Sequence, residues 1–273
     1  HADREVTNRS LISAVENGSL YAVREILESI GYDPSAVDDE GYSALQVAIM
    51  DDYPDIVREL IRYGANINEE EDSHDGYIAP FILACRDGNA ETVRTLLELG
   101  ADPSVFHHGE YPAFLVACQN DNGSVVKELL RLRADYPCIE ISEDEAILLS
   151  IESGSVNAIR ELIEAGIDVI NFRADEKTPL MIASECNDCE MIQELICNGA
   201  DVSEKDKDGF TVLMRAALAG NFTAVCKLLE HGADIDSKDS NGKTVLMTAA
   251  QMRKTRIVNK LLKLGANPEI SDN

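Results

Sequence analysis

The sequence predicts an all-α protein in which pairs of helices stack into a solenoid. The segment DGFTVLMRAALAGNFTAVCKLLEHGADID, which starts at Asp208, recurs 33 residues later as NGKTVLMTAAQMRKTRIVNKLLKLGANPE. Both segments contain two short apolar stretches with helical spacing, and both close on a glycine. A fixed period of roughly 20 to 50 residues is typical of stacked repeats, which bury their apolar faces against one another.

Eight copies of this pattern cover essentially the whole chain. They begin near residues 7, 41, 77, 110, 143, 176, 209 and 242. The first two intervals are 34 and 36 residues, and the others are 33. We therefore expect a single repeat domain over residues 1–273.

Each copy carries the same order of elements, which the seventh copy illustrates. After a polar turn, a short apolar helix is expected over residues 212–218, and its small residues Ala216 and Ala217 let neighbouring copies approach closely. A second helix around Val225 follows a Gly-Asn break. Gly232 ends that helix, because a left-handed backbone costs least without a side chain.

These units resemble ankyrin repeats. TPLMIAS at Thr178–Ser184 is similar to the helix start of that family, and HGADID at His231–Asp236 and NGADVS at Asn198–Ser203 are similar to its Gly-Ala-Asp ending. The resemblance spans all eight copies. It implies an ankyrin-repeat solenoid of antiparallel helix pairs with hairpin-like fingers, which binds other proteins and does not catalyse a reaction.

Several copies depart from the family pattern. The fifth copy, EDEAILLS, lacks the Thr-Pro pair, and an acidic insertion, EEEDSHDG, precedes the third copy. The fingers of the third and fourth copies are longer by a residue. We expect the stack to be irregular or hinged there. The family's helix-start histidine is replaced by Gln46, Ile82, Leu115, Leu148, Met181, Met214 and Met247.

Composition and charge favour an intracellular binding protein. The formal charge of −26 is too acidic for general binding to nucleic-acid phosphates, which requires clustered Lys and Arg. No secretory signal opens the chain, and no apolar run approaches the ~18 to 20 residues of a membrane span. Seven scattered cysteines indicate reduced thiols, so we expect a location in the cytoplasm, with the nucleus as an alternative. The eight in-register copies with short turns favour a monomer.

The cysteines and histidines give weak signals for a metal site. Cys186, Cys189 and the nearby Cys197 lack a second pair at zinc spacing, so incidental or structural thiols, a metal site and a redox-sensitive thiol stay open as interpretations. His74, His107 and His108 fall in turns. We expect no metal and no cofactor. Three further cysteines fall at small apolar helix positions expected in the core: Cys85, Cys118 and Cys226.

No catalytic motif is recognisable. The chain has neither a nucleophile with an orienting base in a known pattern nor a Gly-x4-Gly-Lys phosphate loop, so we expect no enzyme. The acid runs Asp38–Glu40 and Glu69–Asp72 lack the spacing of a calcium loop. They predict either a solvated surface or a site for a basic partner.

Charge is divided unevenly along the chain. Residues 1–241 contain 48 acidic and 18 basic residues, a balance of −30, whereas residues 242–273 contain 2 acidic and 6 basic residues, a balance of +4. The last copy is therefore either a solvated terminal cap or a small basic patch that docks an acidic segment.

The resemblance also places a candidate surface, because partners of the family touch the finger tips and the exposed end of the first helix. Tyr42, Arg86 and Tyr111 are the expected anchors, although packing against the next finger is an equal alternative for the aromatic residues after the finger glycine. The carried-over positions are Asp39, Glu40, Tyr42, Met50, Asp51, Ile78, Arg86, Asp87, His108, Tyr111, Gln119, Asn120, Phe210 and Leu218.

The sequence thus predicts a protein-interaction module, or scaffold, that binds a protein or peptide with a basic segment on a concave acidic face. The alternative is a structural or gating arm of a larger multidomain protein or channel. Fold by itself does not decide between these two classes, because one repeat architecture serves unrelated functions.

Overall fold

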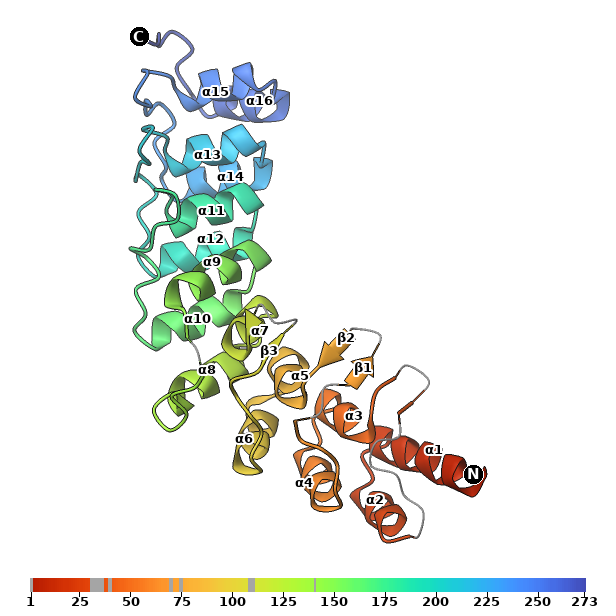
Figure 1. Ribbon diagram of the computed structural model, residues 1–273. Coiled ribbons are helices and arrows are strands. Elements are labelled where there is room, and N and C mark those ends of the chain that lie inside the picture. The colour runs from red at the N-terminus through yellow and green to blue at the C-terminus, as the bar shows by residue number, and fades with distance from the viewer. Residues whose placement is uncertain are drawn as a thin grey trace. The chain divides into compact units, whose positions relative to one another are not determined.

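The computed structural model describes residues 2–29, 37–38, 41–68, 71–73, 76–107, 111–139 and 141–273 (Figure 1). These residues form sixteen helices, which confirms the all-α repeat fold and agrees with about eight helix pairs. Contacts between Cα atoms group the chain into two compact units, residues 1–142 and 143–273, and the second unit starts with the fifth copy. The single domain over residues 1–273 therefore stays a prediction.

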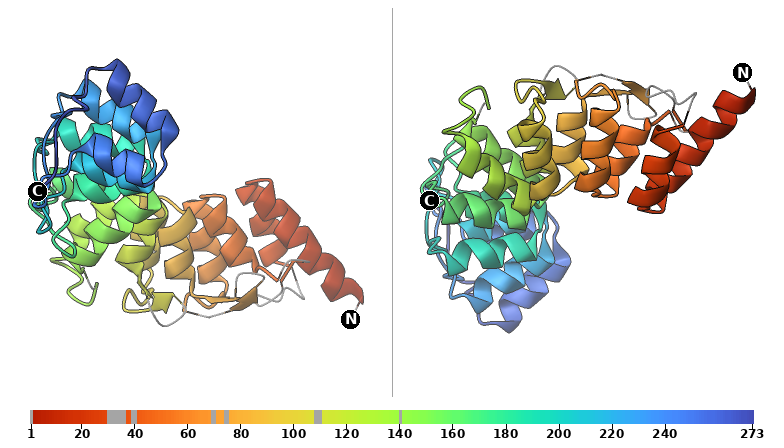
Figure 2. Two further views of the ribbon diagram at one scale, coloured as in Figure 1. Left: turned by 90° about the horizontal axis from the view of Figure 1, so that it is seen from above. Right: turned by 90° about the horizontal axis from the view of Figure 1, so that it is seen from below.

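The first unit stacks its helices in two rows. The odd-numbered helices α1, α3, α5 and α7 pack against one another in chain order, and so do the even-numbered helices (Figures 1 and 2). The helices are α1 Ala2–Glu16, α2 Leu20–Leu27, α3 Ala44–Met50, α4 Pro54–Arg62, α5 Pro80–Asp87, α6 Ala90–Glu98, α7 Ala113–Gln119 and α8 Gly123–Leu132.

The second unit repeats this arrangement, with α9, α11, α13 and α15 in one row and α10, α12, α14 and α16 in the other. Its first helix is longer than its equivalents, because the three acidic residues at its start extend it. The helices are α9 Glu143–Ser153, α10 Val156–Glu164, α11 Pro179–Cys186, α12 Cys189–Cys197, α13 Val212–Ala219, α14 Phe222–Glu230, α15 Val245–Gln251 and α16 Thr255–Lys263.

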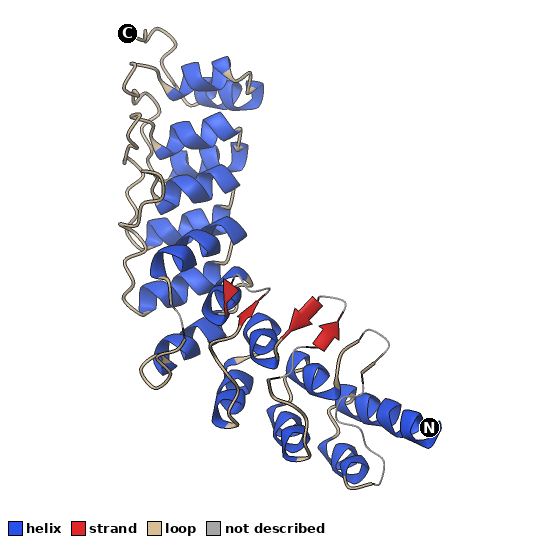
Figure 3. Ribbon diagram, viewed as in Figure 1, coloured by secondary structure: helices blue, strands red, loops and turns tan. Residues whose placement is uncertain are grey.

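The fingers differ between the units. In the first unit, β1 (Glu71–Ser73) pairs antiparallel with β2 (Gly76–Ile78), and β3 (Phe106–His107) pairs with β4 (Tyr111–Pro112) (Figure 3). In the second unit, the described finger pairings are single bridges such as Lys205 with Thr211. The longer fingers of the third and fourth copies are thus the ones that form short hairpins.

Side-chain caps explain why the inner helices begin where they do. The hydroxyls of Thr178, Thr211 and Thr244 accept hydrogen bonds from the backbone N–H three residues later, at 3.1, 3.3 and 3.4 Å. In the second copy, Ser43 and Gln46 form a reciprocal capping box. The glutamine at the family's histidine position therefore stabilises the start of α3.

The core lies between the copies. Ala216 and Ala217 are fully buried, as expected for small residues at the contact between neighbouring helices. Cys85 and Cys118 are also fully buried, but Cys226 is half-buried, so its assignment to the core was wrong. Cys226 lies on α14 at the position that carries Lys127 or Arg160 in earlier copies, where Lys127 is exposed and Arg160 is half-buried.

Hydrogen bonds from asparagines link successive copies. Asn122 Nδ2 donates to the Gly88 carbonyl at 2.7 Å, and Asn221 Nδ2 donates to the Ser184 and Glu185 carbonyls at 2.8 and 2.6 Å. These carbonyls belong to the last turn of the inner helix of the preceding copy, or to the residue that follows it, where helix carbonyls lack the usual N–H partner four residues later. The asparagine that starts one outer helix therefore fixes its register against the previous copy.

We expect Gly232→Ala to lower the free energy of unfolding by about 1 kcal/mol. Gly232 has a φ of +84° and an added Cβ would meet nothing within 4 Å, so backbone strain is the dominant cost. Urea denaturation measures the loss. Gly199→Ala should give a similar loss, since its φ is +97° in equally open space, and an unchanged urea midpoint for both variants would contradict the explanation.

Candidate functional site

One edge of the first unit brings together six of the fourteen predicted partner-binding residues. The inner helices α3, α5 and α7 contact in chain order, so the residues that end them form a row along the stack. Asp51, Asp87, Gln119 and Asn120 are exposed, and Met50 and Arg86 are half-buried. We call these six residues the inner-helix row.

The two acids of the inner-helix row lie where they do not favour helix stability. Asp51 is the C-cap of α3, and Asp87 is the last residue of α5. A negative charge at the negative end of a helix is unfavourable by a few tenths of a kcal/mol or more. Helix stability therefore does not explain these two carboxylates.

Arg86 is held next to its own neighbour. Its Nη2 lies 2.6 Å from Asp87 Oδ2, and its Nε donates to the same oxygen at 2.8 Å. This pair holds the guanidinium against the Asp87 carboxylate, and Asp87 is still exposed. An anchor at Arg86 would have to exchange part of this ion pair for contacts with a partner.

Two of the predicted residues are buried, which corrects their placement on the surface. The Tyr42 side chain is 9% exposed and Ile78 is 1% exposed, so a partner cannot reach either of them. Each of them lies two residues before an inner helix, and Ile78 is the last residue of β2. Burial agrees with local packing, which was the alternative for Tyr42, and it applies to Ile78 as well, so we exclude both from the candidate surface.

The finger formed by β3 and β4 exposes two aromatic side chains. Tyr111 is 38% exposed and pairs across the hairpin with His107, and Phe106 is 42% exposed and pairs with Pro112. Phe106 was not among the predicted residues. The alternation of side chains in the extended finger before His107 was the signal that could have identified it.

Some predicted positions lie outside the described residues. These are Asp39, Glu40 and His108 of the candidate surface. Of the acidic insertion, Glu71 and Asp72 lie in β1, whereas Glu69, Glu70 and His74 are outside the described part.

The last two predicted residues, Phe210 and Leu218, line a groove in the second unit. The groove has a volume of about 250 Å³, and its other lining residues are Asp239, Asn241, Lys243, Thr248, Gln251 and Met252. The guanidinium carbon of Arg215 lies 5.0 Å from the centre of the Phe210 ring, a cation–π distance. Phe210 is therefore held in place by its own copy and presents part of its surface to the groove.

Charges beside Phe210 largely compensate one another. Arg215 Nε donates to Asp206 Oδ2 at 2.6 Å, and Arg215 also lies 3.8 Å from carboxylate oxygens of Glu185 and Asp208. Lys177 Nζ contacts Glu185 Oε2 at 2.6 Å. Three carboxylates therefore face two cations, and this part of the surface is only weakly acidic.

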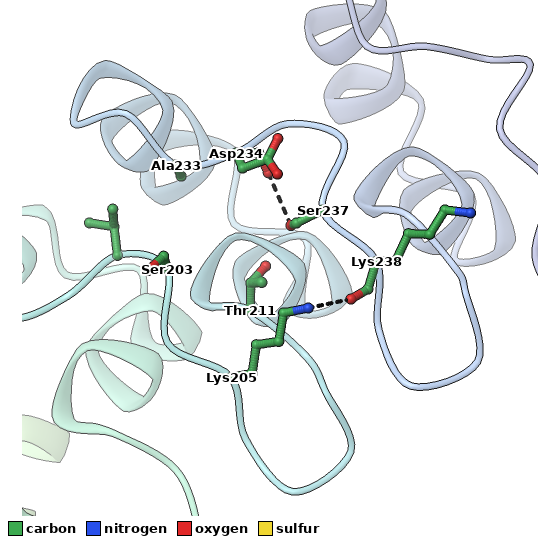
Figure 4. Close-up of a pocket in the computed structure, with 8 residues that line it drawn as sticks. Ser203, Lys205, Thr211, Ala233, Asp234, Ser237 and Lys238 are labelled. Carbon is green, nitrogen blue, oxygen red and sulfur yellow. Dashed lines mark hydrogen bonds between the residues drawn. The ribbon is translucent and has the colours of Figure 1, made fainter.

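A second cleft, of about 360 Å³, lies between the fingers of the seventh and eighth copies (Figure 4). Lys205 Nζ donates to the Lys238 carbonyl at 2.7 Å, and Lys238 Nζ donates in turn to the Ser271 carbonyl at 3.2 Å. The two lysines lie 33 residues apart, at the same position of successive fingers. Their contacts tie neighbouring fingers together, so we assign this cleft to the fold.

The cysteines present no assembled reactive centre in the described residues. All seven are free thiols, and no group of three or more Cys, His, Asp or Glu side chains there is arranged to hold a metal ion. Burial raises the pKa of the Cys186 thiol, with a further contribution from nearby carboxylates such as Glu152. The thiolate of this Cys-x-x-Cys residue is therefore disfavoured near neutral pH.

Membrane insertion by a single long helix finds no support in the described part of the chain. None of the helices there combines the length and the apolar character needed to cross a bilayer.

Two kinds of relative match part of this chain. The ankyrin repeat and KH domain-containing protein mask-1 of Caenorhabditis elegans is 35% identical over 96 residues, which are 35% of this chain and 4% of that protein. Protein phosphatase 1 regulatory subunit 27 is 28% identical over 104 residues in both Homo sapiens and Mus musculus, which are 37% of this chain and 66% of each relative. The chain thus spans less than two thirds of the length of each relative.

The family assignment rests on a wider match. The family model described as ankyrin repeats (3 copies) matches residues 11–107, 114–206 and 185–272. These ranges run through both units and include the helix pairs and fingers described above. The chain therefore belongs to the ankyrin-repeat family.

Proposed function

We propose that this chain is a protein-interaction module whose inner-helix row binds a basic segment of a partner protein. Ankyrin repeats generally mediate binding between proteins. One relative is named as a regulatory subunit, that is, a protein that associates with another chain. The observation that carries the proposal is the placement of exposed Asp51 and Asp87 at the ends of adjacent stacked helices.

Charge and shape support this choice of partner. Asp51 and Asp87 are both placed against the preference of the helix dipole. Asp87 is partly compensated by its ion pair with Arg86, so a role in binding is better supported for Asp51. The balance of −30 over residues 1–241 attracts basic segments over long range. The finger of the fourth copy adds Tyr111 and Phe106, which are the large, partly exposed side chains that anchor interfaces.

The proposal also includes the oligomeric state, the cellular compartment and the mode of action of the protein. We propose a monomer in the cytoplasm or nucleus that acts by binding, without catalysis, cofactor or nucleic acid. Reduced thiols support the compartment, and the acidic balance supports a protein partner over a polyanion.

We expect the double variant Asp51→Asn, Asp87→Asn to bind Lys- and Arg-rich peptides about tenfold more weakly than the parent, because two close ionic contacts are lost. Fluorescence anisotropy with a peptide array measures this. Raising the salt concentration should weaken binding by the parent, since the Debye length falls to about 3 Å at 1 M.

The matched control is Asp55→Asn, Glu91→Gln, which removes two exposed acids from the outer helices α4 and α6 of the same copies. It should bind within about twofold of the parent. Equal losses for both double variants, or affinity that does not respond to salt, would show that the inner-helix row is not the site.

A second candidate function is a structural or gating arm of a larger protein. One observation favours it: the segment matched in mask-1 is 4% of a protein whose name includes a further domain. Immunoblotting with an antibody raised against this chain measures the size of the native polypeptide. A band far above 29.9 kDa would support the arm, and a band at that mass would exclude it.

A further inference from the structure

We propose that the outer face of helices α14 and α16 binds an acidic segment of a partner protein, with an arginine stacked on an aromatic ring as its central contact. This face belongs to the outer row of helices in the second unit, not to the fingers or the inner helices. The inference goes beyond the proposed function and does not depend on it, because it concerns another face, the other unit and a partner of opposite charge.

In earlier copies, ion pairs between successive outer helices neutralise the arginines of this row. Arg24 Nη2 lies 2.6 Å from Glu59 Oε1 of the following copy. Arg160 and Glu194 form the same pair between the fifth and sixth copies, at 2.7 Å. Each of these arginines therefore has a carboxylate partner supplied by the repeat itself.

The last two copies replace both members of this pair. The glutamate position is occupied by Lys227 on α14 and by Lys260 on α16. The arginine position is occupied by Cys226 and Asn259, neither of which is basic. Within the part of the chain that the structure describes, neither lysine forms an ion pair. Both ammonium groups can therefore bind an incoming carboxylate.

A stacked arginine lies on the same two helices. The guanidinium carbon of Arg256 on α16 lies 3.8 Å from the centre of the Phe222 ring on α14, a cation–π contact. Arg256 has no ion pair and no side-chain hydrogen bond among the described residues, so its five N–H donors can serve a ligand. The ring orients the guanidinium before a ligand arrives, and the planar fork of N–H groups matches the two oxygens of a carboxylate.

Both members of this stacked pair depart from the repeat. No other copy has an aromatic residue at the position of Phe222, the first residue of its outer helix. At the position of Arg256, the second, third and sixth copies carry an acid, which the dipole favours in the first turn of a helix: Asp55, Glu91 and Glu190. Arg256 has the sign that the dipole disfavours there, so helix stability does not explain it.

Basic residues outnumber acids on these helices. On α16, Arg256, Lys260 and Lys263 follow one another at spacings of four and three residues, so they share one helix face. On α14, Lys227 is accompanied by the exposed Glu230. Four basic residues and one acidic residue give the two helices a balance of +3. Because α14 and α16 pack against each other, we call the four cations the outer basic patch.

The surroundings of the outer basic patch favour a short protein segment over a nucleic acid. On the neighbouring helix α12, Glu190 is exposed and Glu194 is already paired with Arg160. A long polyanion that extended along the row would meet these carboxylates, and the chain as a whole carries −26. A few carboxylates on a short segment can reach the patch without this repulsion, and clustered cations recognise acidic motifs in this way.

The test measures binding of a short fluorescein-labelled peptide built of glutamate and alanine. We expect saturable binding to the parent protein that weakens as the salt concentration rises, because the contacts are ionic. The same peptide with glutamine in place of glutamate should not bind.

The double variant Lys227→Glu, Lys260→Glu is decisive, because it restores the glutamates that earlier copies of this fold carry at these positions. It should weaken binding of the acidic peptide about tenfold or more. The matched control Lys207→Glu, Lys243→Glu makes the same change of charge on the fingers of the same unit and should bind within about twofold of the parent. Arg256→Lys keeps the charge but loses the planar fork, and should weaken binding about fivefold. Melting temperatures verify that each variant is folded.

Four results would overturn the inference. They are failure of the acidic peptide to bind the parent, equal losses for the two double variants, unchanged affinity of Arg256→Lys, and tighter binding of a single-stranded oligonucleotide of equal charge. None of them bears on the inner-helix row, which is tested with basic peptides, so the two proposals fail separately.

Discussion

Replacing Phe114 by alanine is expected to lower the free energy of unfolding by about 3–5 kcal/mol. Phe114 lies on α7, is fully buried, and is one of the two largest fully buried side chains among the described residues. Its loss removes apolar burial and leaves a cavity between α7 and its neighbours α5 and α8. In a stacked array each copy contacts only its neighbours, so few other contacts compensate for a weakened interface.

Phe106→Ala is the matched control for Phe114→Ala. It deletes the same side chain from the finger of the same copy, where Phe106 is 42% exposed, and should cost less than about 1 kcal/mol. Urea denaturation followed by circular dichroism gives both values. Comparable losses for the two variants would mean that the packing around α7 is looser than the structure shows.

The repeat made the fold predictable from sequence. Thr178, Thr211 and Thr244 could be recognised as helix starts because capping is local and depends on residues three apart. The small residues Ala216 and Ala217 indicated the close contact between copies, and both are fully buried. Because the pattern repeats, what was inferred for one copy could be applied to the equivalent positions of the other copies.

Exposure of the finger residues could not be predicted in the same way. Tyr42, Ile78, Tyr111 and Phe210 occupy one position of the repeat, directly before the inner helix. Ile78 is 1% exposed and Tyr111 is 38% exposed, because the neighbouring fingers differ in length and pairing. A repeat position defines the neighbours of a residue but not how closely they cover it.

The groove beside Phe210 shows what sequence reasoning can still recover. Phe210 and Leu218 were predicted from the family's binding surface, yet Met252 and Lys243 were not. The missing signal was a comparison across copies: Thr248 at the position of Arg215, and Gln251 at the position of Glu185. Replacements of large or charged residues at one repeat position mark the places where a stacked array changes its surface.

The outer helices are joined by ion pairs between successive copies. The pair with the most buried carboxylate, that of Glu128, should make the free energy of unfolding depend on pH. Glu128 is 8% exposed and accepts hydrogen bonds from Arg131 on its own helix, at 2.6 and 3.1 Å, and from Arg94 Nε of the preceding copy at 2.9 Å. The bonds from Arg131 and Arg94 lower its pKa to about 2, although burial alone would raise it.

A carboxyl group whose pKa is lowered by folding stabilises the protein above its unfolded pKa of roughly 4.5. That contribution is lost as the pH falls from about 4.5 towards 2, because the unfolded chain then binds a proton more readily than the folded chain. A shift of this size corresponds to about 3 kcal/mol, and solvent around the half-exposed Arg94 reduces it to about 2 kcal/mol.

We therefore expect Glu128→Gln to lower the free energy of unfolding by about 2 kcal/mol at pH 7, since two guanidinium groups lose a shared carboxylate. The cost should shrink by more than half at pH 3, where the parent begins to lose the same interaction. Urea denaturation at the two pH values measures the difference, and a ¹³C NMR titration of the Glu128 carboxyl in the parent locates its pKa.

Glu98→Gln provides the comparison within the same row of pairs. Glu98 lies 3.1 Å from Arg58 of the preceding copy, but it is 51% exposed, so its pair is worth less than about 1 kcal/mol. Both variants lose an ion pair, but only Glu128 is buried. We therefore expect a larger loss in the free energy of unfolding for Glu128→Gln than for Glu98→Gln. A loss at Glu128 that stays constant from pH 7 to pH 3 would show that shape and hydrogen bonding, rather than charge, hold the third and fourth copies together at this position.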